Sequence, residues 1–248
     1  MGSVRLQVFL SRSGACSRRQ ALVIVFAGRV SVNGRRVTEP SFAVSPEKDR
    51  VFLDGRPLPA QGERGPAAKD YVILHKPKGV VTTKSDRFAA RTVLDLLPDE
   101  LRHINPAGRL DKDTTGLLFL SNDGDLVHRL THPSFDVEKV YRARLDKPLA
   151  AADKKTLEAG IVLDGRRTRP CSLRAEGLEV EVTLHEGRKR QIRRMFALCG
   201  YAVKELHRLR HGPLTLGALA PGAWRRLTGV EVAALKDYAA QPLPRAKR

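Results

Sequence analysis

Residues 108 to 133, GRLDKDTTGLLFLSNDGDLVHRLTHP, are the most informative stretch of the sequence. It places an acid, Asp111, close to Arg109 and ahead of an apolar run that starts at Gly116 and ends at the turn residues NDG. Apolar runs bounded by turn residues indicate buried strands, so we expect Asp111 on a loop that feeds a rigid strand. Loops mounted on such scaffolds often carry catalytic groups. An Asp near an Arg is also common on solvated surfaces, so other segments must decide between these interpretations.

The chain is strongly basic. Its 248 residues include 45 Lys and Arg against 27 Asp and Glu, which gives a net charge of +18 and a pI of about 10.4. This charge favours a partner dense in phosphates, and nucleic acid is preferred over a membrane because the sequence has no run of about 18 apolar residues. The N-terminus lacks the pattern of a secretory signal. Three scattered cysteines argue against a disulfide framework or a zinc site, so we expect a cytoplasmic protein with reduced thiols and no metal.

Two helices are predicted near the N-terminus. Ser17, followed three residues later by Gln20, has the form of a capping box, which predicts a helix from Arg18 to Ala27 with Gly28 ending it. A shorter helix is expected at about residues 8 to 13. Further on, Asn33-Gly34 separates two alternating runs, which predicts a hairpin, and Val51 to Leu53 predicts a further strand.

Composition divides the chain into parts. Residues 59 to 69, PAQGERGPAAK, are rich in Pro, Gly and charge without periodicity, as is typical of a linker. We therefore predict a small domain at 1–58, a linker at 59–69, a larger domain at 70–235 and a disordered basic tail at 236–248.

The larger domain is predicted to be α+β. Strand-like runs occur at YVILHK, GLLFLS, EKVYRARL, LEVEVTLH and AVKELHRLR. They alternate with helical patterns near residues 92–97, 125–130, 151–159 and 190–198. No Gly-rich phosphate loop follows a strand, which disfavours a doubly wound parallel sheet. We expect a mixed, mainly antiparallel sheet with helices on one face.

Six arginines fall at the helix ends and the hairpin turn of the small domain. They are Arg12, Arg18, Arg19, Arg29, Arg35 and Arg36. Scattered exposed arginines are common, but this grouping also fits a basic face for RNA phosphates. Aromatic residues are only 5% of the chain, so recognition through stacking rings is not expected.

The string RLQVFLSRSGACSRRQALVIVFAGRVSVNGRRVTEPSFAV, which contains these arginines, resembles the S-four-like (αL) RNA-binding domain. The match is close in LxxFLxxxGxxSRRxA and in GRVxVNGxxV. The segment LVIVFA at 22–27 departs from that pattern by being more apolar. It is expected either to bury an extra contact with the second domain or to thicken the core of the first.

Five ordered motifs of the larger domain resemble those of the ribosomal RNA pseudouridine synthases. They are KPKGVVTT (76–83), GRLDKDTTGLLFLSNDGDLVHRLTHP (108–133), EKVYRARL (138–145), EGRKRQIRR (186–194) and GPLTLGALAPGAWRRL (212–227). Within that superfamily, the attached N-terminal domain and the form EGRxRxxRR resemble the branch whose members modify single uridines in small- or large-subunit ribosomal RNA. The resemblance implies an isomerase that needs no cofactor.

The resemblance also implies roles for individual residues. Asp111 matches the catalytic aspartate, Tyr141 the tyrosine that lies against the target base, and Arg193 the basic residue that pairs with the aspartate. Arg109 matches the arginine that approaches the space left by the flipped-out nucleotide, and Ile192 an apolar wall of the pocket. Attack on the sugar, attack on the base and removal of a sugar proton all stay open as the role of the aspartate.

The remaining polar residues of these motifs are assigned to RNA contact or scaffold. Arg190 and Arg194 are expected to make phosphate or surface contacts, and Lys76 and Lys78, in KPKG, to serve RNA approach or scaffold. Thr115 stands where the family pattern has serine, a mild change because both carry a hydroxyl. The histidines of the central motif, at 128 and 132, are not expected to act in catalysis.

The sequence therefore predicts a pseudouridine synthase acting on ribosomal RNA, with the large-subunit RNA favoured over the small. A noncatalytic RNA-binding ribosome-assembly factor on the same scaffold is the main alternative. A DNA-binding regulator is disfavoured because we find no recognition helix or dimer seam. The target uridine and the orientation of the N-terminal domain stay open, and a monomer is expected.

Overall fold

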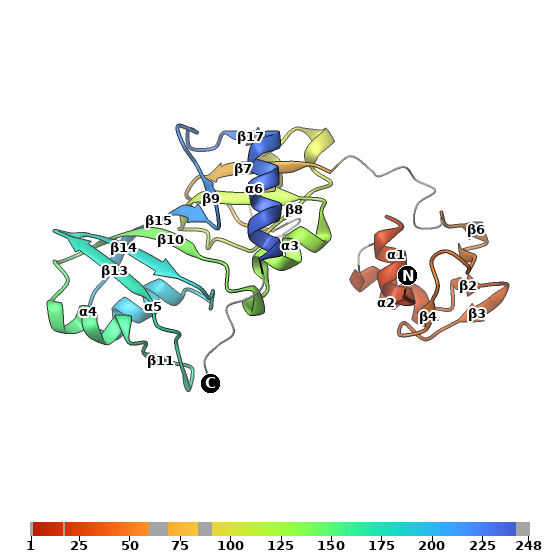
Figure 1. Cartoon of the computed structure of the whole chain (residues 1–248), viewed down its shortest axis with the longest axis horizontal. Coiled ribbons are helices and arrows are strands. Elements are labelled where there is room, and N and C mark those ends of the chain that lie inside the picture. The colour runs from red at the N-terminus through yellow and green to blue at the C-terminus, as the bar shows by residue number, and fades with distance from the viewer. Residues whose placement is uncertain (1, 17, 60–68, 84–90, 242–248) are drawn as a thin grey trace. The chain divides into compact units, whose positions relative to one another are not determined.

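The computed structural model describes residues 2–16, 18–59, 69–83 and 91–241. Its contacts divide the chain into two compact units, Met1–Ala68 and Lys69–Arg248 (Figure 1). Most of the predicted linker, residues 60 to 68, lies outside the described residues. Each unit has its own apolar core, and each is described by itself.

The first unit packs two helices against short strands. The helices are α1 (Leu6–Arg12) and α2 (Arg18–Phe26). The strands are β1 (Val4–Arg5), β2 (Val30–Val32), β3 (Arg35–Val37), β4 (Ala43–Val44), β5 (Val51–Leu53) and β6 (Arg56–Pro57). Strands β3, β2, β5 and β6 form one sheet in that order, and β1 pairs with β4. Leu6, Phe9 and Leu10 of α1 are fully buried against Ala21 and Val25 of α2.

The local predictions for this unit are largely confirmed. Strands β2 and β3 form the predicted hairpin, and Asn33 and Gly34 have φ of 50° and 81°, as a type I′ turn requires. Helix α1 starts two residues earlier than expected, because Leu6 already packs into the core. The predicted cap, Ser17, lies outside the described residues.

The second unit is built on a nine-stranded sheet. Its main path runs β13-β14-β10-β15-β9-β7-β17, with β16 beside β15 and β8 beside β9. The strands are β7 (Tyr71–Lys76), β8 (Asn105–Pro106), β9 (Thr115–Ser121), β10 (Lys139–Leu145), β13 (Ser172–Glu176), β14 (Glu179–Leu184), β15 (Val203–His211), β16 (Leu214–Thr215) and β17 (Trp224–Arg226). Strands β15 and β9 run parallel, and the other pairs of this sheet are antiparallel. The mixed, mainly antiparallel α+β prediction is confirmed.

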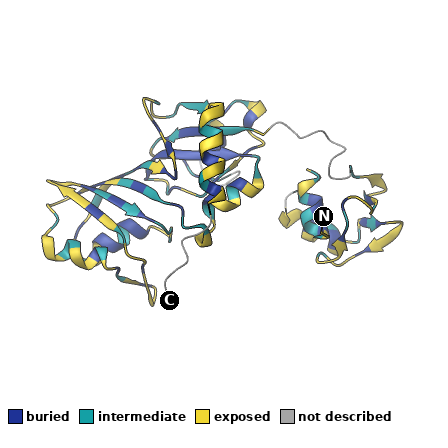
Figure 2. Ribbon diagram, viewed as in Figure 1, coloured by how far each residue is buried: buried dark blue, intermediate teal, exposed yellow. Residues whose placement is uncertain are grey.

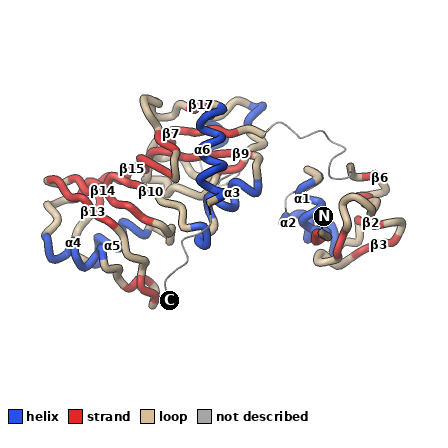
Figure 3. Tube along the Cα trace, in the orientation of Figure 1, coloured by secondary structure: helices blue, strands red, loops and turns tan. Residues whose placement is uncertain are grey.

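Helices cover both faces of this sheet, so the prediction of helices on one face is wrong. The helices are α3 (Gly124–Thr131), α4 (Ala151–Glu158), α5 (Gln191–Leu198) and α6 (Gly229–Ala240). Helices α4 and α5 pack against the face that carries Leu206, whereas α3 and α6 pack against the face that carries Leu117 (Figure 3). His207 follows Leu206 and shares the face of Leu117, because it pairs with Thr115 of β9. Helices are therefore required on both sides to bury both faces.

Shorter elements complete the unit. They are the 3₁₀ helices η1 (Val93–Leu96), η2 (Asp99–Leu101) and η3 (Pro133–Phe135) and the hairpin of β11 (Val162–Leu163) and β12 (Arg166–Arg167). Figure 2 shows the buried residues along the central strands and the inner sides of the helices. Helix α6 continues to Ala240, so residues 236 to 240 are helical rather than part of a tail. The burial of Leu235 and Ala239 against α3 and β9 explains this extension.

Candidate active site

The segment that carries Asp111 is pinned by the KPKGVVTT motif. Thr82 donates its hydroxyl to the carbonyl of Leu110 at 2.9 Å and accepts the amide of Leu110 at 3.2 Å. The amide of Gly79 donates to the carbonyl of Lys112 at 2.8 Å. Asp111 itself is half-buried, and its carbonyl accepts the amide of Thr114, which closes a tight turn. The loop before β9 is therefore rigidly held, as the sequence predicted for a scaffolded loop.

Lys76 is the central tie of this loop. Its ammonium group donates to the carbonyls of Thr114 (2.8 Å), Pro77 (3.1 Å) and Lys112 (3.4 Å), and the residue is fully buried. Burial lowers the pKa of Lys76 to about 8, against the opposing charges of Asp113 and Asp111. Because three backbone carbonyls occupy its ammonium group, Lys76 has no donor left for an RNA phosphate, and of its two predicted roles, RNA approach and scaffold, the contacts favour scaffold. Lys78 is exposed and keeps that assignment as a prediction.

Helix α5 holds the same loop from the other side. Arg193 donates to the carbonyl of Val203 at 2.6 Å and to that of Asp113 at 3.3 Å. Its Nε lies 3.3 Å from a carboxylate oxygen of Asp113. Arg190 binds the same carboxylate through two hydrogen bonds of 3.0 and 3.1 Å. The two arginines therefore grip Asp113, two residues after Asp111.

This arrangement differs from the expected pairing of Arg193 with Asp111. Among the described residues, the carboxylate partner of Arg193 is Asp113. Burial raises the pKa of Asp113, but hydrogen bonds from Arg190 and the charge of Arg193 outweigh it and the net pKa is lowered. Tertiary packing sets the distance between α5 and the loop, and therefore whether Arg193 pairs with Asp113 or with Asp111. The sequence carries no signal for this distance.

The other arginines of EGRKRQIRR also act as structural ties. Arg194 forms a bidentate pair with Asp164 at 2.6 and 2.9 Å. Arg188, which the sequence analysis did not single out, donates to three backbone carbonyls of the β11–β12 hairpin. These are the carbonyls of Leu163 (3.3 Å), Arg166 (2.8 Å) and Arg167 (2.6 Å).

Tyr141 and Arg109 line one cavity of about 120 Å³. Tyr141 lies on β10 and Arg109 just before Asp111, so the cavity opens beside the pinned loop. Ile192 is buried on α5 in the apolar cluster against which Tyr141 packs. Among the described residues, Tyr141 and Arg109 are the predicted site residues that line this cavity, and Asp111 and Ile192 do not line it. His132 also lines this cavity, and its Nδ1 lies 2.6 Å from the hydroxyl of Ser134.

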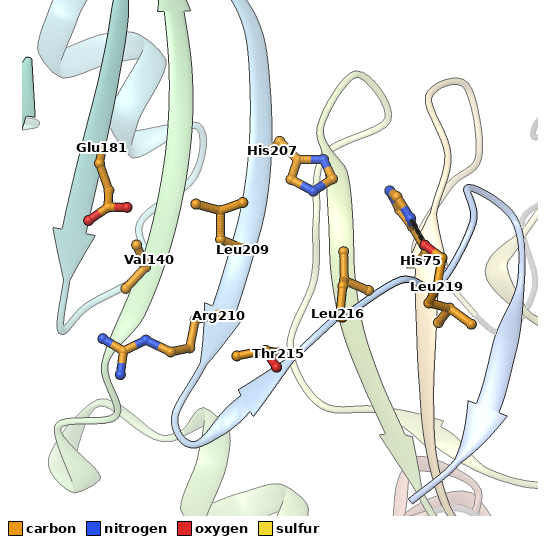
Figure 4. Close-up of a pocket in the computed structure, with 10 residues that line it drawn as sticks. His75, Val140, Glu181, His207, Leu209, Arg210, Thr215, Leu216 and Leu219 are labelled. Atoms are coloured by element: carbon orange, nitrogen blue, oxygen red, sulfur yellow. Dashed lines mark hydrogen bonds between the residues drawn. The ribbon is translucent and has the colours of Figure 1, made fainter. Parts of the chain in front are cut away.

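A larger cavity of about 420 Å³ lies on the opposite face of the β10–β15 pair. Alternate residues of a strand point to opposite faces, and His207 and Leu209 line this larger cavity whereas Arg208 lines the smaller one. Figure 4 shows the rings of His75 and His207 beside each other among the residues that line this cavity. His207 Nδ1 lies 2.8 Å from the hydroxyl of Thr115, so this threonine supports the sheet on the side away from Tyr141.

Gly116 fixes how the two central strands meet. It has φ of +107°, and a Cβ there would lie 2.3 Å from the carbonyl oxygen of Arg208. Only glycine fits this close parallel contact between β9 and β15.

The six arginines predicted for RNA contact in the first unit are all exposed. Arg29 is held by Asp54 in a bidentate pair, and Arg36 donates to the carbonyl of Ala27 at 3.1 Å. Part of LVIVFA thickens the core, since Val25 is buried, whereas Val23 and Phe26 are 70% and 68% exposed.

Within residues 2–16, 18–59, 69–83 and 91–241, no group of three or more His, Cys, Asp or Glu side chains is arranged to hold a metal ion. No helix in the same residues combines the length and the apolar character that crossing a bilayer demands.

Comparison with known protein families shows an RNA-modifying enzyme joined to a small RNA-binding domain. Residues 70–198 match the family model of the RNA pseudouridylate synthases, and residues 4–51 match that of the S4 domain. The chain belongs to the RNA pseudouridylate synthase family, whose members are isomerases.

Similar proteins cover nearly the whole chain. Ribosomal large subunit pseudouridine synthase B of Bacillus subtilis is 35% identical over 95% of this chain and 96% of its own. Ribosomal small subunit pseudouridine synthase A of Vibrio cholerae is 38% identical over 94% and 99%. A crystal structure of a pseudouridylate synthase superposes with a TM-score of 0.68 at 32% identity, covering 94% of this chain and all of the other.

Proposed function

We propose that this protein isomerises a specific uridine of ribosomal RNA to pseudouridine, with the large-subunit RNA as the favoured substrate and Asp111 as the catalytic group. The observation that carries the proposal is the loop of Asp111, pinned by Lys76, Gly79 and Thr82 and gripped at Asp113 from α5. Such rigidity preorganises a carboxylate for one reaction geometry.

The surroundings of Asp111 suit an ionised carboxylate. The charges of Lys76 and Arg190 both interact with that of Asp111. No hydrogen bond from a side chain within the described part of the protein occupies the Asp111 carboxylate, whereas Asp113 is bound by two arginines. Asp113 therefore serves to position the loop, and Asp111 is left for the substrate.

The shape of the site suits a nucleotide taken out of the RNA stack. A stacked or paired uridine hides its glycosidic bond, and extruding it costs a few kcal/mol. Tyr141 offers a ring for the extruded base, and exposed Arg109 at the rim of the cavity suits the space that the base leaves. The exposed arginines of the first unit supply backbone contacts that hold a structured RNA in place.

The test is pseudouridine formation on unmodified transcripts of both ribosomal RNAs. Asp111→Asn should keep the RNA affinity within about twofold and abolish pseudouridine, mapped as primer-extension stops after carbodiimide treatment. Asp99→Asn is the control, because Asp99 is exposed and its ion-pair partner within the described residues is Arg102. Full activity of Asp111→Asn would overturn the assignment, and the position of the stop identifies the substrate RNA.

The alternative is a noncatalytic RNA-binding ribosome-assembly factor. The two functions separate in a deletion strain complemented with Asp111→Asn. Restored growth together with absent pseudouridine favours the assembly factor. A protein that only binds RNA has no need for a buried lysine, Lys76, and a carboxylate, Asp113, held by two arginines in the loop of Asp111. This arrangement favours the enzyme.

A further inference from the structure

Four side chains that line the smaller cavity share one face of the β10–β15 pair. They are those of Lys139, Tyr141, Arg208 and His211. The strand register places Lys139 opposite His211 and Tyr141 opposite Arg208. Residues directly opposite each other in antiparallel strands present their side chains to the same face, with Cβ atoms about 4.5–5.5 Å apart. A bulge between Val140 and Tyr141 shifts the register by one residue and keeps both pairs on this face. All four residues line the cavity.

Arg208 is a buried cation with an unused donor. It is 2% exposed, and its Nε donates to the carbonyl of Leu117 at 2.7 Å. Its Nη2 is buried and has no hydrogen-bond partner among the described residues, and no described carboxylate pairs with it. A guanidinium stays protonated in proteins, and buried donors almost always have partners. Arg208 is therefore prepared for an anionic ligand.

Lys139 adds a second cation to the same cavity. Its ammonium group donates to the carbonyl of Val137 at 2.9 Å. Burial lowers the pKa of Lys139 to about 8, the charge of Arg208 lowers it as well, and Asp136 opposes them. Two adjacent cations in a site with little water raise each other's energy, and an anion between them relieves this cost.

The nearby carboxylates are already engaged. Asp136 pairs with Arg169 at 2.6 Å. Glu186, which lines the cavity, accepts from Gln191 at 2.7 Å and lies 3.3 Å from Nε of Arg188. Their charge is largely neutralised, so the cavity keeps a net positive character.

His211 contributes an acceptor rather than a donor. It is 1% exposed, and its Nε2 lies 3.1 Å from the carbonyl of Leu130. A carbonyl only accepts, so Nε2 carries the proton of a ring whose pKa is held well below its usual value by burial and by the charges of Arg208 and Lys139. Nδ1 is then a bare acceptor, buried and unpartnered within the described part of the chain. A ligand hydroxyl that donates a hydrogen bond would satisfy this nitrogen.

We propose that this cavity binds a ribose phosphate of the RNA chain at or beside the flipped uridine, with the phosphate on Lys139 and Arg208 and the 2′-hydroxyl on Nδ1 of His211. The identity of the RNA rests on the proposed function. Phosphate contacts fix the position of a nucleic acid, and the 2′-hydroxyl distinguishes RNA from DNA. The pairing of Arg208 with Tyr141 then sets the distance between the anchored backbone and the base.

The anion site is tested first with inorganic phosphate and the full chain at low ionic strength. Saturable NMR shifts of the side-chain nitrogens of Arg208 and His211 are expected in wild type and in Lys155→Met, an exposed control on α4. They should weaken by about tenfold or more in affinity in Lys139→Met, and recover in Lys139→Arg. Unsaturable shifts, or equal affinities in Lys139→Met and Lys155→Met, would overturn the site. This readout does not depend on pseudouridine formation.

The RNA assignment is tested with short RNAs that span the uridine mapped by primer extension, bound to proteins that also carry Asp111→Asn. A neutral methylphosphonate replaces one linkage at a time within two nucleotides of the target. At one linkage it should weaken binding by about tenfold, and Lys139→Met should add no further loss. A 2′-deoxy sugar there should weaken binding to wild-type His211 but not to His211→Phe. If the losses from the methylphosphonate and from Lys139→Met add at every linkage, the phosphate contact is refuted. If the 2′-deoxy sugar leaves the affinity of wild-type His211 unchanged, the hydroxyl contact is refuted. In either case, pseudouridine formation by the enzyme with Asp111 intact would leave the proposed function standing.

Discussion

Two sets of basic side chains, one in each unit, stand in opposite environments. The six arginines of the first unit are exposed, whereas Lys76 and Arg208 of the second are 0% and 2% exposed. An exposed cation neutralises an RNA phosphate at little desolvation cost, but a buried cation has lost its hydration and needs carbonyl oxygens or anions in its place. The net charge of +18 therefore serves two purposes. Part of it is exposed and available to RNA, and part of it holds the loop of Asp111 together.

The largest effect is expected at Arg193, which ties α5 to both the loop and β15. Arg193→Met should lower the free energy of unfolding by about 2–3 kcal/mol and the rate of pseudouridine formation by about 100-fold, because charged hydrogen bonds to Val203 and Asp113 are lost together. Urea unfolding and single-turnover rates measure both. Arg194→Met, next on the same helix, should cost less than about 1 kcal/mol, since its partner Asp164 is 74% exposed. Equal losses of unfolding free energy in Arg193→Met and Arg194→Met would show that the burial of Arg193 does not make its contacts stronger than those of Arg194.

Lys76 should reveal its burial through pH. Its pKa of about 8 in the folded protein lies below the ordinary value of 10.5, so the folded state binds fewer protons between these pH values. The loss of folding stability caused by burying the charged lysine is complete below pH 8. It decreases as the pH rises to 10.5, by at most about 1.4 kcal/mol per pH unit. The stability of wild type relative to Lys76→Met should therefore increase over this range in urea unfolding. A difference in stability that stays flat over this range would contradict this role.

The smallest effect is expected in the first unit. Arg35→Ser should weaken RNA binding uniformly and reduce the slope of log affinity against log salt by about 0.7–0.9, the loss of one phosphate contact. Arg29→Ser should change the slope less, because Asp54 already holds that guanidinium. Fluorescence anisotropy across a salt series measures both slopes. A larger change for Arg29→Ser than for Arg35→Ser would show that the ion pair with Asp54 does not keep Arg29 from RNA.

The local elements followed from the sequence where one short-range rule acted alone. The Asn33-Gly34 hairpin, α2 and the strand after Asp111 depend on turn chemistry and hydrophobic period within a few residues. The extension of α6 to Ala240 and the placement of helices on both faces depend on partners far away in the chain. A period seen in one segment does not say which face of a distant sheet it will cover.

The motifs, the net charge and the acid on a loop before a buried strand can all be read from the amino-acid order. Three contacts depend on the folded chain: Lys76 with the loop of Asp111, Arg193 with Asp113, and Arg208 opposite Tyr141 on the adjacent strands β15 and β10. The physical reason is that a lysine or arginine has the same charge and length in either environment. Which carbonyls, carboxylates or phosphates it meets is set by strand register and helix packing, which bring together residues that lie far apart in the chain.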